Sequence, residues 1–472
     1  MKRRDFLKTM GIAGAGMMMP SLFLERFAGA ALPAGINFVK PAVLPKLISI
    51  FLYGGPSELA GNLTNILDIN AQSLNKYPDT LVTSGGALGA YVTARGFWGG
   101  GTSGAGGDDM ETMVTAGDMT VYRTCNRVKD DNKSHGTSVT QNLVGNLDIT
   151  KPGFATTLAA VLTANNAFSK PIDSLILPVV NFEGESVVFN LGDLDISEML
   201  RPVSLDSNFQ NPFSRYLYTS PALDATSDSA MDAKAMEKNA ALGSAYQEIY
   251  DAFVKRASLS AFIEANFNET AVNANLPLDP NTNQAIVYPD TNFGNRLKAA
   301  VSLAISNPDT FFINLGSGGL GGWDDHSSTL NAYPQRMREL MAALKVAVQH
   351  LNLIRNDANR STDIRTAAGA TVIFVFGDFG RNANLNAAMG WDHGNNQNLY
   401  TLGGWGVPGR GLGKVVGTTS LTGSAAENRL FTTPATGSYQ FEPLSVASTI
   451  YKYFGVQNPE VLTGESAIDE TT

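Results

Sequence analysis

Cysteine and histidine are scarce in this chain of 472 residues, which contains one cysteine and four histidines. The cysteine, Cys125, cannot form an internal disulfide, and its apolar surroundings indicate a buried thiol more than a reactive one. After residue 30 no apolar run is long enough to cross a bilayer, so the pattern predicts no permanent membrane span there. The formal net charge is −9. This acidic balance lacks the basic face that a nucleic-acid partner requires.

The amino terminus carries the three parts of an export signal. Residues 3–7 (RRDFL) place paired arginines before an aromatic residue and a leucine, as twin-arginine signals do. The uncharged stretch 9–24 follows, and residues 28–30 (AGA) offer a cleavage site. We therefore predict a signal peptide over residues 1–30, export by the twin-arginine translocase, and a periplasmic or secreted protein. Cleavage is favoured over retention as a tether because the stretch is short for a membrane span and contains Pro20.

Near-continuous apolar segments predict buried strands, and such strands are typical of a parallel sheet with helical crossovers. The strands are expected at 44–53, 119–125, 175–180, 310–315 and 371–376. Apolar residues at helical spacing predict helices at about 230–265, 295–305, 334–351 and 444–454, with Pro334 in a first turn. The predicted class is α/β: a three-layer α/β/α sandwich with a largely parallel central sheet.

The alternation of strand and helix weakens between about 146 and 292, where residues 204–229 are rich in Ser, Asp, Asn and Pro. We interpret this region as an insertion or cap on one main domain that spans about 44–460. Two glycine-rich loops, 86–107 and 403–417, show no phosphate-loop pattern, because no Gly-Lys-Ser/Thr follows either of them.

Three of the four histidines stand in glycine-rich and aspartate-rich segments. His135 lies in NKSHG, His326 in GGWDDH and His393 in GWDHG. Neutral imidazole and ionised aspartate together suit zinc and related metals. The fourth, His350, lies inside a predicted amphipathic helix without a neighbouring carboxylate, so we predict that it is structural.

Each of these segments follows a predicted strand, and ligands of open α/β sheets bind outside the carboxyl ends of the strands. Asp324 and His326 are two residues apart, so in extended backbone both side chains point the same way. Asp378 follows the last predicted strand, and Asp392 adjoins His393. The pattern predicts a site for one or two divalent ions; zinc is favoured, with manganese, calcium and magnesium as alternatives. A WDDH or WDHG segment alone is more often a surface turn, but two such segments after strands favour a metal site.

Nearby polar side chains are candidates for catalysis. Arg381 could bind an anionic substrate group or form an ordinary salt bridge. Ser134 could be a nucleophile beside His135, or a plain N-cap of a helix that begins near Gly136. Thr137 is a competing hydroxyl.

Taken in order, the motifs resemble a bacterial family, domain-of-unknown-function family 1501, from about residue 44 to 454. The resemblance rests on the export signal, GGPS at 54–57, Ser134-His135 with Gln141, GGWDDH at 321–326, DFGR at 378–381, Asn386 and DHG at 392–394. The family is similar in fold to the alkaline phosphatase and sulfatase superfamily, whose members hold one or two divalent metals and attack phosphate or sulfate esters. The resemblance implies that Asp324, His326, Asp378, Asp392 and His393 are metal ligands.

The chain departs from the family pattern near its first strand, where many members carry an aspartate. Ala60 cannot coordinate a metal, so Glu58 or Ser57 would have to substitute. Two hypotheses follow. The first is an exported metal-dependent hydrolase acting on phosphate or sulfate esters. The second is a catalytically impaired secreted or cell-envelope protein that binds an envelope component or has a structural role.

Overall fold

The computed structural model describes residues 32–57, 66–78, 104–205, 229–231, 233–234, 236–238, 240, 259, 261–263, 265–424 and 426–472. The signal predicted for residues 1–30, Glu58, Ala60 and most of the helix predicted at 230–265 lie outside these residues. Within the described part of the chain, no helix has the length and apolar character of a membrane span.

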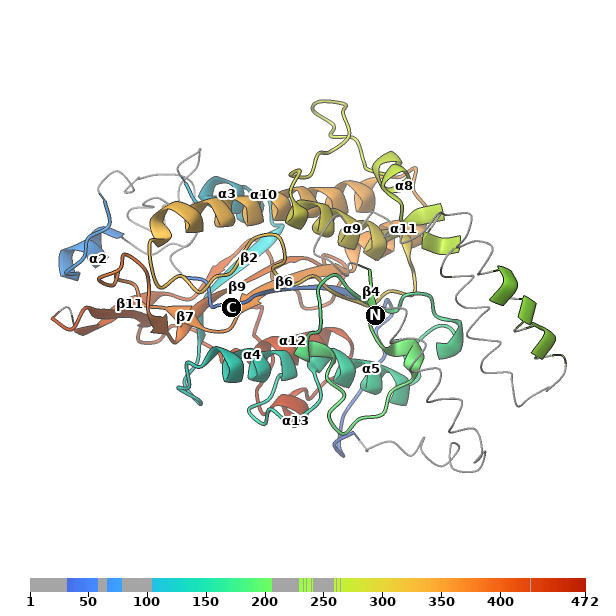
Figure 1. The fold of residues 1–472 in the computed structure, drawn as a ribbon, viewed down its shortest axis with the longest axis horizontal. Helices are drawn as coiled ribbons and strands as arrows, with labels where there is room; N and C mark the ends of the chain where they lie inside the picture. The colour runs from blue at the N-terminus through green and yellow to red at the C-terminus, as the bar shows by residue number, and fades with distance from the viewer. Residues whose placement is uncertain are drawn as a thin grey trace.

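Eight strands of the described residues form one mixed, mostly parallel sheet (Figure 1). Its order is β10 (Val415–Val416), β2 (Met119–Asn126), β9 (Asn396–Gly403), β6 (Thr371–Gly377), β1 (Lys46–Leu52), β5 (Phe312–Asn314), β3 (Val179–Asn181) and β4 (Val203–Ser204). Strand β9 pairs antiparallel with β2 and β6, and the other neighbours pair parallel. The predicted α/β class with a largely parallel sheet is confirmed.

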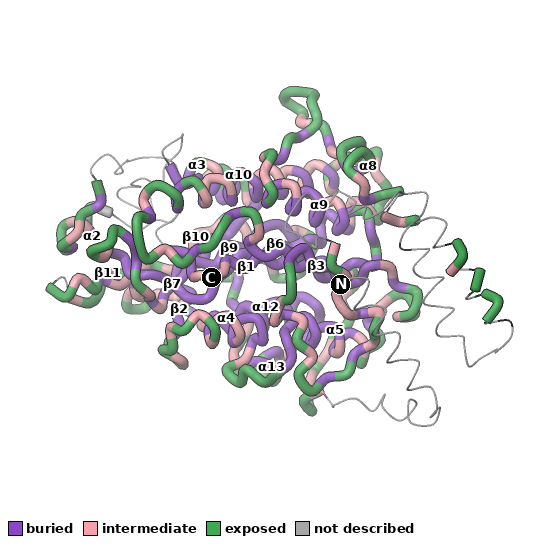
Figure 2. Tube along the Cα trace, in the orientation of Figure 1, coloured by how far each residue is buried: buried purple, intermediate pink, exposed green. Residues whose placement is uncertain are grey.

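Alternate residues of the central strands face two separate apolar layers. In β1, Ile48 and Ile50 belong to one buried cluster, whereas Leu47 and Phe51 belong to the other. Strand β6 alternates in the same way. Both faces of these strands are therefore covered, which explains why their sequences are apolar throughout. The buried strands lie between partly exposed helices in Figure 2.

Helices cover both faces of the sheet (Figure 1). One face carries α3 (Gly107–Thr115), α8 (Glu269–Ala274), α9 (Asn292–Ser306), α10 (Thr329–Asn356) and α11 (Thr362–Gly369). The other carries α4 (His135–Val144), α5 (Phe154–Ala164), α12 (Ser445–Tyr453) and α13 (Glu460–Thr463). The helices predicted at 295–305, 334–351 and 444–454 correspond to α9, α10 and α12.

Helix α10 begins earlier than the sequence indicated. It starts at Thr329, so Pro334 lies inside the helix and not in its first turn. The backbone N–H groups of Ser328 and Thr329 donate to the carbonyls of Ala388 and Met389 at 3.0 and 3.1 Å. The start of the helix is thus set by contact with a distant loop, which local spacing cannot reveal.

The predicted insertion at 146–292 contributes partly to the main body. Its described residues supply α5, β3 and β4, joined by the short helical turns η4 (Ile172–Ser174), η5 (Val187–Phe189) and η6 (Glu198–Leu200). Residues 206–228 lie outside the described part of the chain. The insertion stays a prediction.

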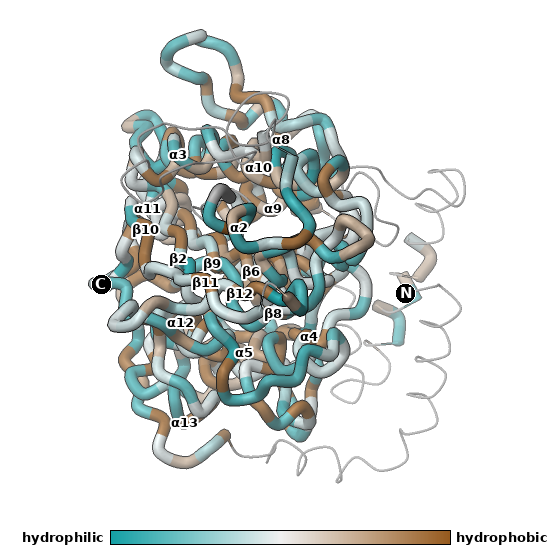
Figure 3. Tube along the Cα trace, turned by 90° about the vertical axis from the view of Figure 1, so that its left-hand side faces the viewer, coloured by the Kyte–Doolittle hydropathy of each residue, from teal (hydrophilic) through white to brown (hydrophobic). Residues whose placement is uncertain are grey.

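Small elements gather at the carboxyl ends of the parallel strands. These are α2 (Ile66–Gln72), β7 (Gly380–Arg381), β8 (His393–Gly394), β11 (Thr419–Ser424) and β12 (Arg429–Pro434). Figure 3 looks onto this end of the sheet, with α2, β8, β11 and β12 toward the viewer. Strands β7 and β8 pair antiparallel, as do β11 and β12.

Two residues that the sequence indicates to be buried or structural, Cys125 and His350, are both buried. Cys125 is an unpaired thiol in β2 with no exposed surface, and burial raises its pKa. His350 is buried in α10, where Nδ1 lies 3.1 Å from the hydroxyl of Tyr288.

Candidate metal centre

Four side chains from three segments meet at the carboxyl edge of the sheet. The possible ligand atoms of His135, Asp324, His326 and His393 all lie within 4.8 Å of one another. Asp324 Oδ1 lies 3.2 Å from Nε2 of His135, 3.0 Å from Nε2 of His326 and 3.9 Å from Nε2 of His393. Three imidazoles therefore present the same ring nitrogen to one carboxylate oxygen. We call these four residues the His/Asp cluster.

The sheet topology brings the cluster together. His135 is the first residue of α4, the helix that follows β2. Asp324 and His326 lie in the loop between β5 and α10. His393 begins β8 and pairs with Arg381 of β7, which follows β6 directly. Each segment thus leaves a strand of the same sheet at its carboxyl end, where ligands of such folds bind.

Two buried tryptophans hold the loops that carry the cluster. Trp323 precedes Asp324, Trp391 lies two residues before His393, and neither has any exposed surface. Both pack against the ring of Tyr333 on α10, with centroid distances of 5.6 Å for Trp323 and 4.8 Å for Trp391. Both loops are therefore fixed against one aromatic side chain.

Gly54, just after β1, allows the loop that carries Asp324 to pack closely against the end of this strand. Its φ is +112°, and a Cβ atom there would lie 2.4 Å from the backbone nitrogen of Asp324. Its own N–H donates to Oδ2 of Asp378 at 3.1 Å. No other residue type combines this conformation with this contact without strain.

Arg381 is buried beside the cluster and acts as a fixed donor. Its Nη2 lies 2.7 Å from Oδ1 of Asp324, and its side chain has no exposed surface. The guanidinium also donates to the backbone carbonyls of Gly54, Gly55, Trp323 and Trp391. Of the two roles considered from the sequence, the structure shows the salt bridge. Its Nη1 lies 3.4 Å from Nε2 of His326.

Carboxylates stand behind two of the imidazoles. Asp378, whose side chain is fully buried, places Oδ2 2.8 Å from Nδ1 of His135. Asp392 Oδ1 lies 3.4 Å from Nδ1 of His326. Asn386 donates to the same oxygen of Asp392 at 3.1 Å. A carboxylate at Nδ1 holds the proton there and leaves Nε2 to accept or coordinate, which is the usual arrangement around metal-bound histidine.

The ionisation of the cluster follows from these contacts. The hydrogen bond with Asp378 raises the pKa of His135, and burial raises the pKa of Asp378. Burial and the nearby charge of Arg381 lower the pKa of His393 to about 4. Burial raises the pKa of Asp324, but the hydrogen bond and charge of Arg381 outweigh it and lower the pKa overall.

The donor set fits a divalent cation. The Nε2 atoms of His326 and His393 lie 3.0 Å apart. Two nitrogens on one tetrahedral zinc ion are roughly 3.3 Å apart, given bonds of about 2.0–2.1 Å. Neutral imidazole with carboxylate is a donor set that zinc prefers. One further carboxylate oxygen, Oδ1 of Asp378, is buried without a hydrogen-bond partner among the described residues.

The structure places the other predicted site residues as follows. Ser134 is the N-cap residue of α4, which was one of the two roles that the sequence suggested for it. Its side chain makes no capping hydrogen bond. Glu58 lies outside the described residues. Asp378 and Asp392 contact imidazoles of the cluster from behind, at Nδ1. Asp325 pairs with Arg336 and is not one of the four residues of the cluster.

Sequence reasoning missed the amide that supports the Asp378 segment. Asn142 of α4 donates to the carbonyls of Gly377 and Asp378 at 2.9 and 2.8 Å. Its own oxygen accepts from Arg127 at 2.8 Å. The available signal was spacing: Asn142 lies seven residues, two helical turns, after His135 and so near the same side of α4.

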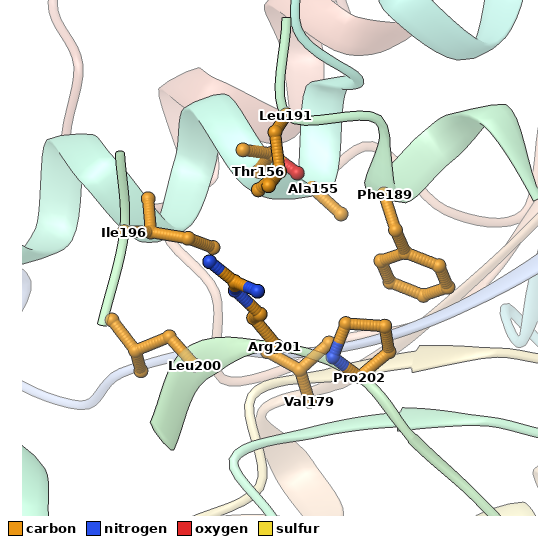
Figure 4. Close-up of a pocket in the computed structure, with 9 residues that line it drawn as sticks. All are labelled: Ala155, Thr156, Val179, Phe189, Leu191, Ile196, Leu200, Arg201 and Pro202. Atoms are coloured by element: carbon orange, nitrogen blue, oxygen red, sulfur yellow. The ribbon is translucent and has the colours of Figure 1, made fainter. Parts of the chain in front are cut away.

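Two pockets differ in their relation to the cluster. A small apolar pocket of about 190 Å³ lies between α5, η5 and η6, with Arg201 at its wall (Figure 4). It shares no residue with the cluster. A larger pocket of about 590 Å³ includes Tyr53, Val139 and Gly322, each close in sequence to a residue of the site.

The fold and the cluster define an α/β protein with a possible metal-binding His/Asp centre at the carboxyl edge of a mostly parallel sheet. A family model described as "Protein of unknown function (DUF1501)" matches residues 214–436. The match includes Asp324, His326 and His393 but not His135. No curated protein matches the chain.

Proposed function

We propose that this chain is an exported metal-dependent hydrolase that acts on phosphate or sulfate esters. The observation that carries the proposal is the His/Asp cluster, in which three imidazole nitrogens surround one carboxylate oxygen at the carboxyl edge of the sheet. Neutral imidazoles and an ionised aspartate are what a divalent cation of the zinc type requires.

His135, Asp324, His326 and His393 would hold the cation, with Asp378 and Asp392 orienting the imidazoles from behind. When bound, the cation would polarise an ester oxygen and activate a hydroxyl or water. Ser134 caps α4 next to His135, where the helix N-terminus favours negative charge. We assign it the role of nucleophile. Arg381 balances the charge of Asp324 and keeps that carboxylate ionised.

The export signal and the likeness to the alkaline phosphatase fold belong to the same proposal. Paired arginines, an uncharged stretch and an AGA site in residues 1–30 support export to the periplasm or medium. The mostly parallel sheet with helices on both faces supports the three-layer fold of that superfamily, with a cap inserted within 146–292.

Metal analysis tests the first step. The protein, purified without chelator, is expected to contain zinc, or manganese, calcium or magnesium, at near-stoichiometric level. The Asp324→Ala and His393→Ala variants should each bind the metal more weakly than the wild type. The loss in metal affinity should exceed the roughly 10- to 100-fold that is typical when a hydrogen-bond partner of a metal ligand is removed. Asp148→Ala, at an exposed turn, is the matched control and should keep the metal. Wild-type protein that binds none of these ions would defeat the proposal.

Hydrolysis is the second step. A panel of 4-nitrophenyl phosphate and 4-nitrophenyl sulfate is assayed with the wild type, both cluster variants and Asp148→Ala. Activity in the wild type and the control, with loss in the cluster variants, is the expected result. Activity that survives both cluster substitutions would mean that the cluster does not catalyse the reaction.

One observation favours a second candidate, a secreted or cell-envelope protein that kept the fold and lost turnover. Arg381 already neutralises Asp324 at 2.7 Å, so the central carboxylate has a positive partner without any cation. Stoichiometric metal binding without hydrolysis of either ester would support this candidate.

A further inference from the structure

A pocket of about 590 Å³ adjoins the His/Asp cluster along three segments. On α4, Val139 and Leu143 follow His135 at intervals of four residues, so the three share one face of the helix. After β1, Tyr53 lines the pocket and is followed by Gly54, which contacts Asp378. Such a pocket is large enough for a small organic group.

The loop after β5 makes the third connection. Residues 317–319, 321 and 322 line the pocket, and Asp324 of the cluster follows two residues later. Trp323, between them, donates its backbone N–H to the carbonyl of Tyr53 at 3.0 Å. Helix α4 and the loop after β5 therefore carry residues of both the pocket and the cluster, although no residue belongs to both.

A buried carboxylate, Glu183, is among the residues that line this pocket. Its Oε1 accepts from the hydroxyl of Tyr53 at 2.9 Å and from Nδ2 of Asn314 at 2.6 Å. A Cβ at Gly316 would lie 1.7 Å from Oε2, so this oxygen rests against glycine backbone. Ser186 also hydrogen-bonds the carboxylate. A carboxylate offers about four acceptor positions, so acceptor capacity remains beyond these three donors.

The charged residues that line the pocket are acidic. Glu183 and the exposed Glu185 both line the pocket, and none of the described residues that line it is basic. The buried Arg296 of α9 acts on Glu183 through its charge but does not line the pocket. An anionic group would meet two carboxylates here without a cationic partner, whereas hydroxyl and ammonium groups would find acceptors.

We propose that this pocket binds the alcohol part of the substrate, and that Glu183 selects a group rich in hydrogen-bond donors, sugar-like hydroxyls or a primary ammonium, over an anionic one. The assignment to the alcohol part rests on the proposed function. Binding of the donor-rich group does not, because it uses pocket residues alone.

The test measures binding of three probes of matched size: glucosamine, glucose and gluconate. Their affinities for the purified full chain are measured by ligand-observed NMR or thermal shift at millimolar concentration. We expect glucosamine to bind most tightly and gluconate most weakly. Glu183→Gln should weaken glucosamine about tenfold or more, the usual effect of losing a hydrogen bond to a charged group, and should change glucose less. Glu198→Gln, exposed and outside the pocket, should leave all three affinities unchanged.

A second variant keeps the test decisive if Glu183→Gln does not fold. Glu185→Lys adds a cation at an exposed position of the lining and should reverse the ranking in favour of gluconate. Equal binding of the three probes by the wild type, binding of none, or an unchanged ranking in the folded variants would each overturn the inference. Hydrolysis of 4-nitrophenyl esters without probe selectivity would overturn the pocket assignment alone. Selective binding without hydrolysis would overturn the proposed function and the assignment to the alcohol part, and would leave the binding of the donor-rich group standing.

Discussion

The Asp378→Asn substitution tests whether a buried carboxylate determines which ring nitrogen of His135 carries the proton. The side chain of Asp378 has no exposed surface, and its Oδ2 faces both Nδ1 of His135 at 2.8 Å and the N–H of Gly54 at 3.1 Å. Asparagine has nearly the same size. If its oxygen keeps the Gly54 bond, its NH₂ competes for the imidazole and favours a lone pair on Nδ1. The ring proton then moves to Nε2, the atom that faces Asp324.

The expected result is a large loss of zinc affinity. A charge-assisted hydrogen bond contributes about 1.5–3 kcal/mol, equivalent to roughly 10- to 100-fold in affinity. Competition with a chromophoric chelator measures it. Asp392→Asn is the matched control, because Asp392 lies 3.4 Å from His326 and its side chain is 53% exposed, which predicts a loss below about tenfold. Equal losses in the two variants, or none in Asp378→Asn while the wild type binds zinc, would refute the reasoning.

Two further predictions concern stability. Burial lowers the pKa of His350 to about 3 from an unfolded value of 6.5, so its contribution is full above pH 6.5 and declines as the pH falls toward 3. Between about pH 7.5 and pH 5 His350 should lower the free energy of unfolding by about 2 kcal/mol. This value comes from the interval of about 1.5 pH units between 6.5 and 5, at about 1.36 kcal/mol per unit. Urea unfolding at both pH values should show that the His350→Gln variant loses correspondingly less unfolding free energy than the wild type. Identical pH dependence in the two proteins would count against a buried neutral imidazole. Gly54→Ala should destabilise the protein by about 2 kcal/mol or more, because a Cβ there would lie 2.4 Å from the nitrogen of Asp324 at a φ of +112°. Gly136→Ala, in α4 with nothing within 4 Å, should be neutral or slightly stabilising in the same assay, and similar destabilisation of both variants would contradict this account.

The sequence predicted β1 and β6, whose buried residues are mostly apolar. Strands β1 and β6 are covered by apolar clusters on both faces, so their composition reveals them. Strand β9 escaped prediction because its buried positions include Asn396 and Gln397, residues typical of loops. Each side chain makes a tertiary hydrogen bond: Asn396 donates to the carbonyl of Arg123, and Gln397 accepts from the N–H of Gly377. Such partners are distant in sequence and invisible to local patterns.

The candidate site could likewise be predicted only in part. Spacing and strand ends sufficed to group Asp324, His326 and His393, because all strands that carry them end at one edge. The sequence did not distinguish which carboxylates face the cluster and which stand behind it. Asp378 and Asp392 contact Nδ1 atoms, and that choice depends on side-chain directions that only the packed loops determine.

The packing of Trp323 and Trp391 on one tyrosine couples the two loops mechanically. Because both indoles rest on Tyr333, Asp324 and His393 cannot shift independently without disturbing the first turns of α10. The geometry offered to a cation is then decided when the helix docks, before any ion arrives. Little conformational freedom would remain to be lost on binding, so ions whose preferred coordination differs from this spacing would be discriminated against by the scaffold itself.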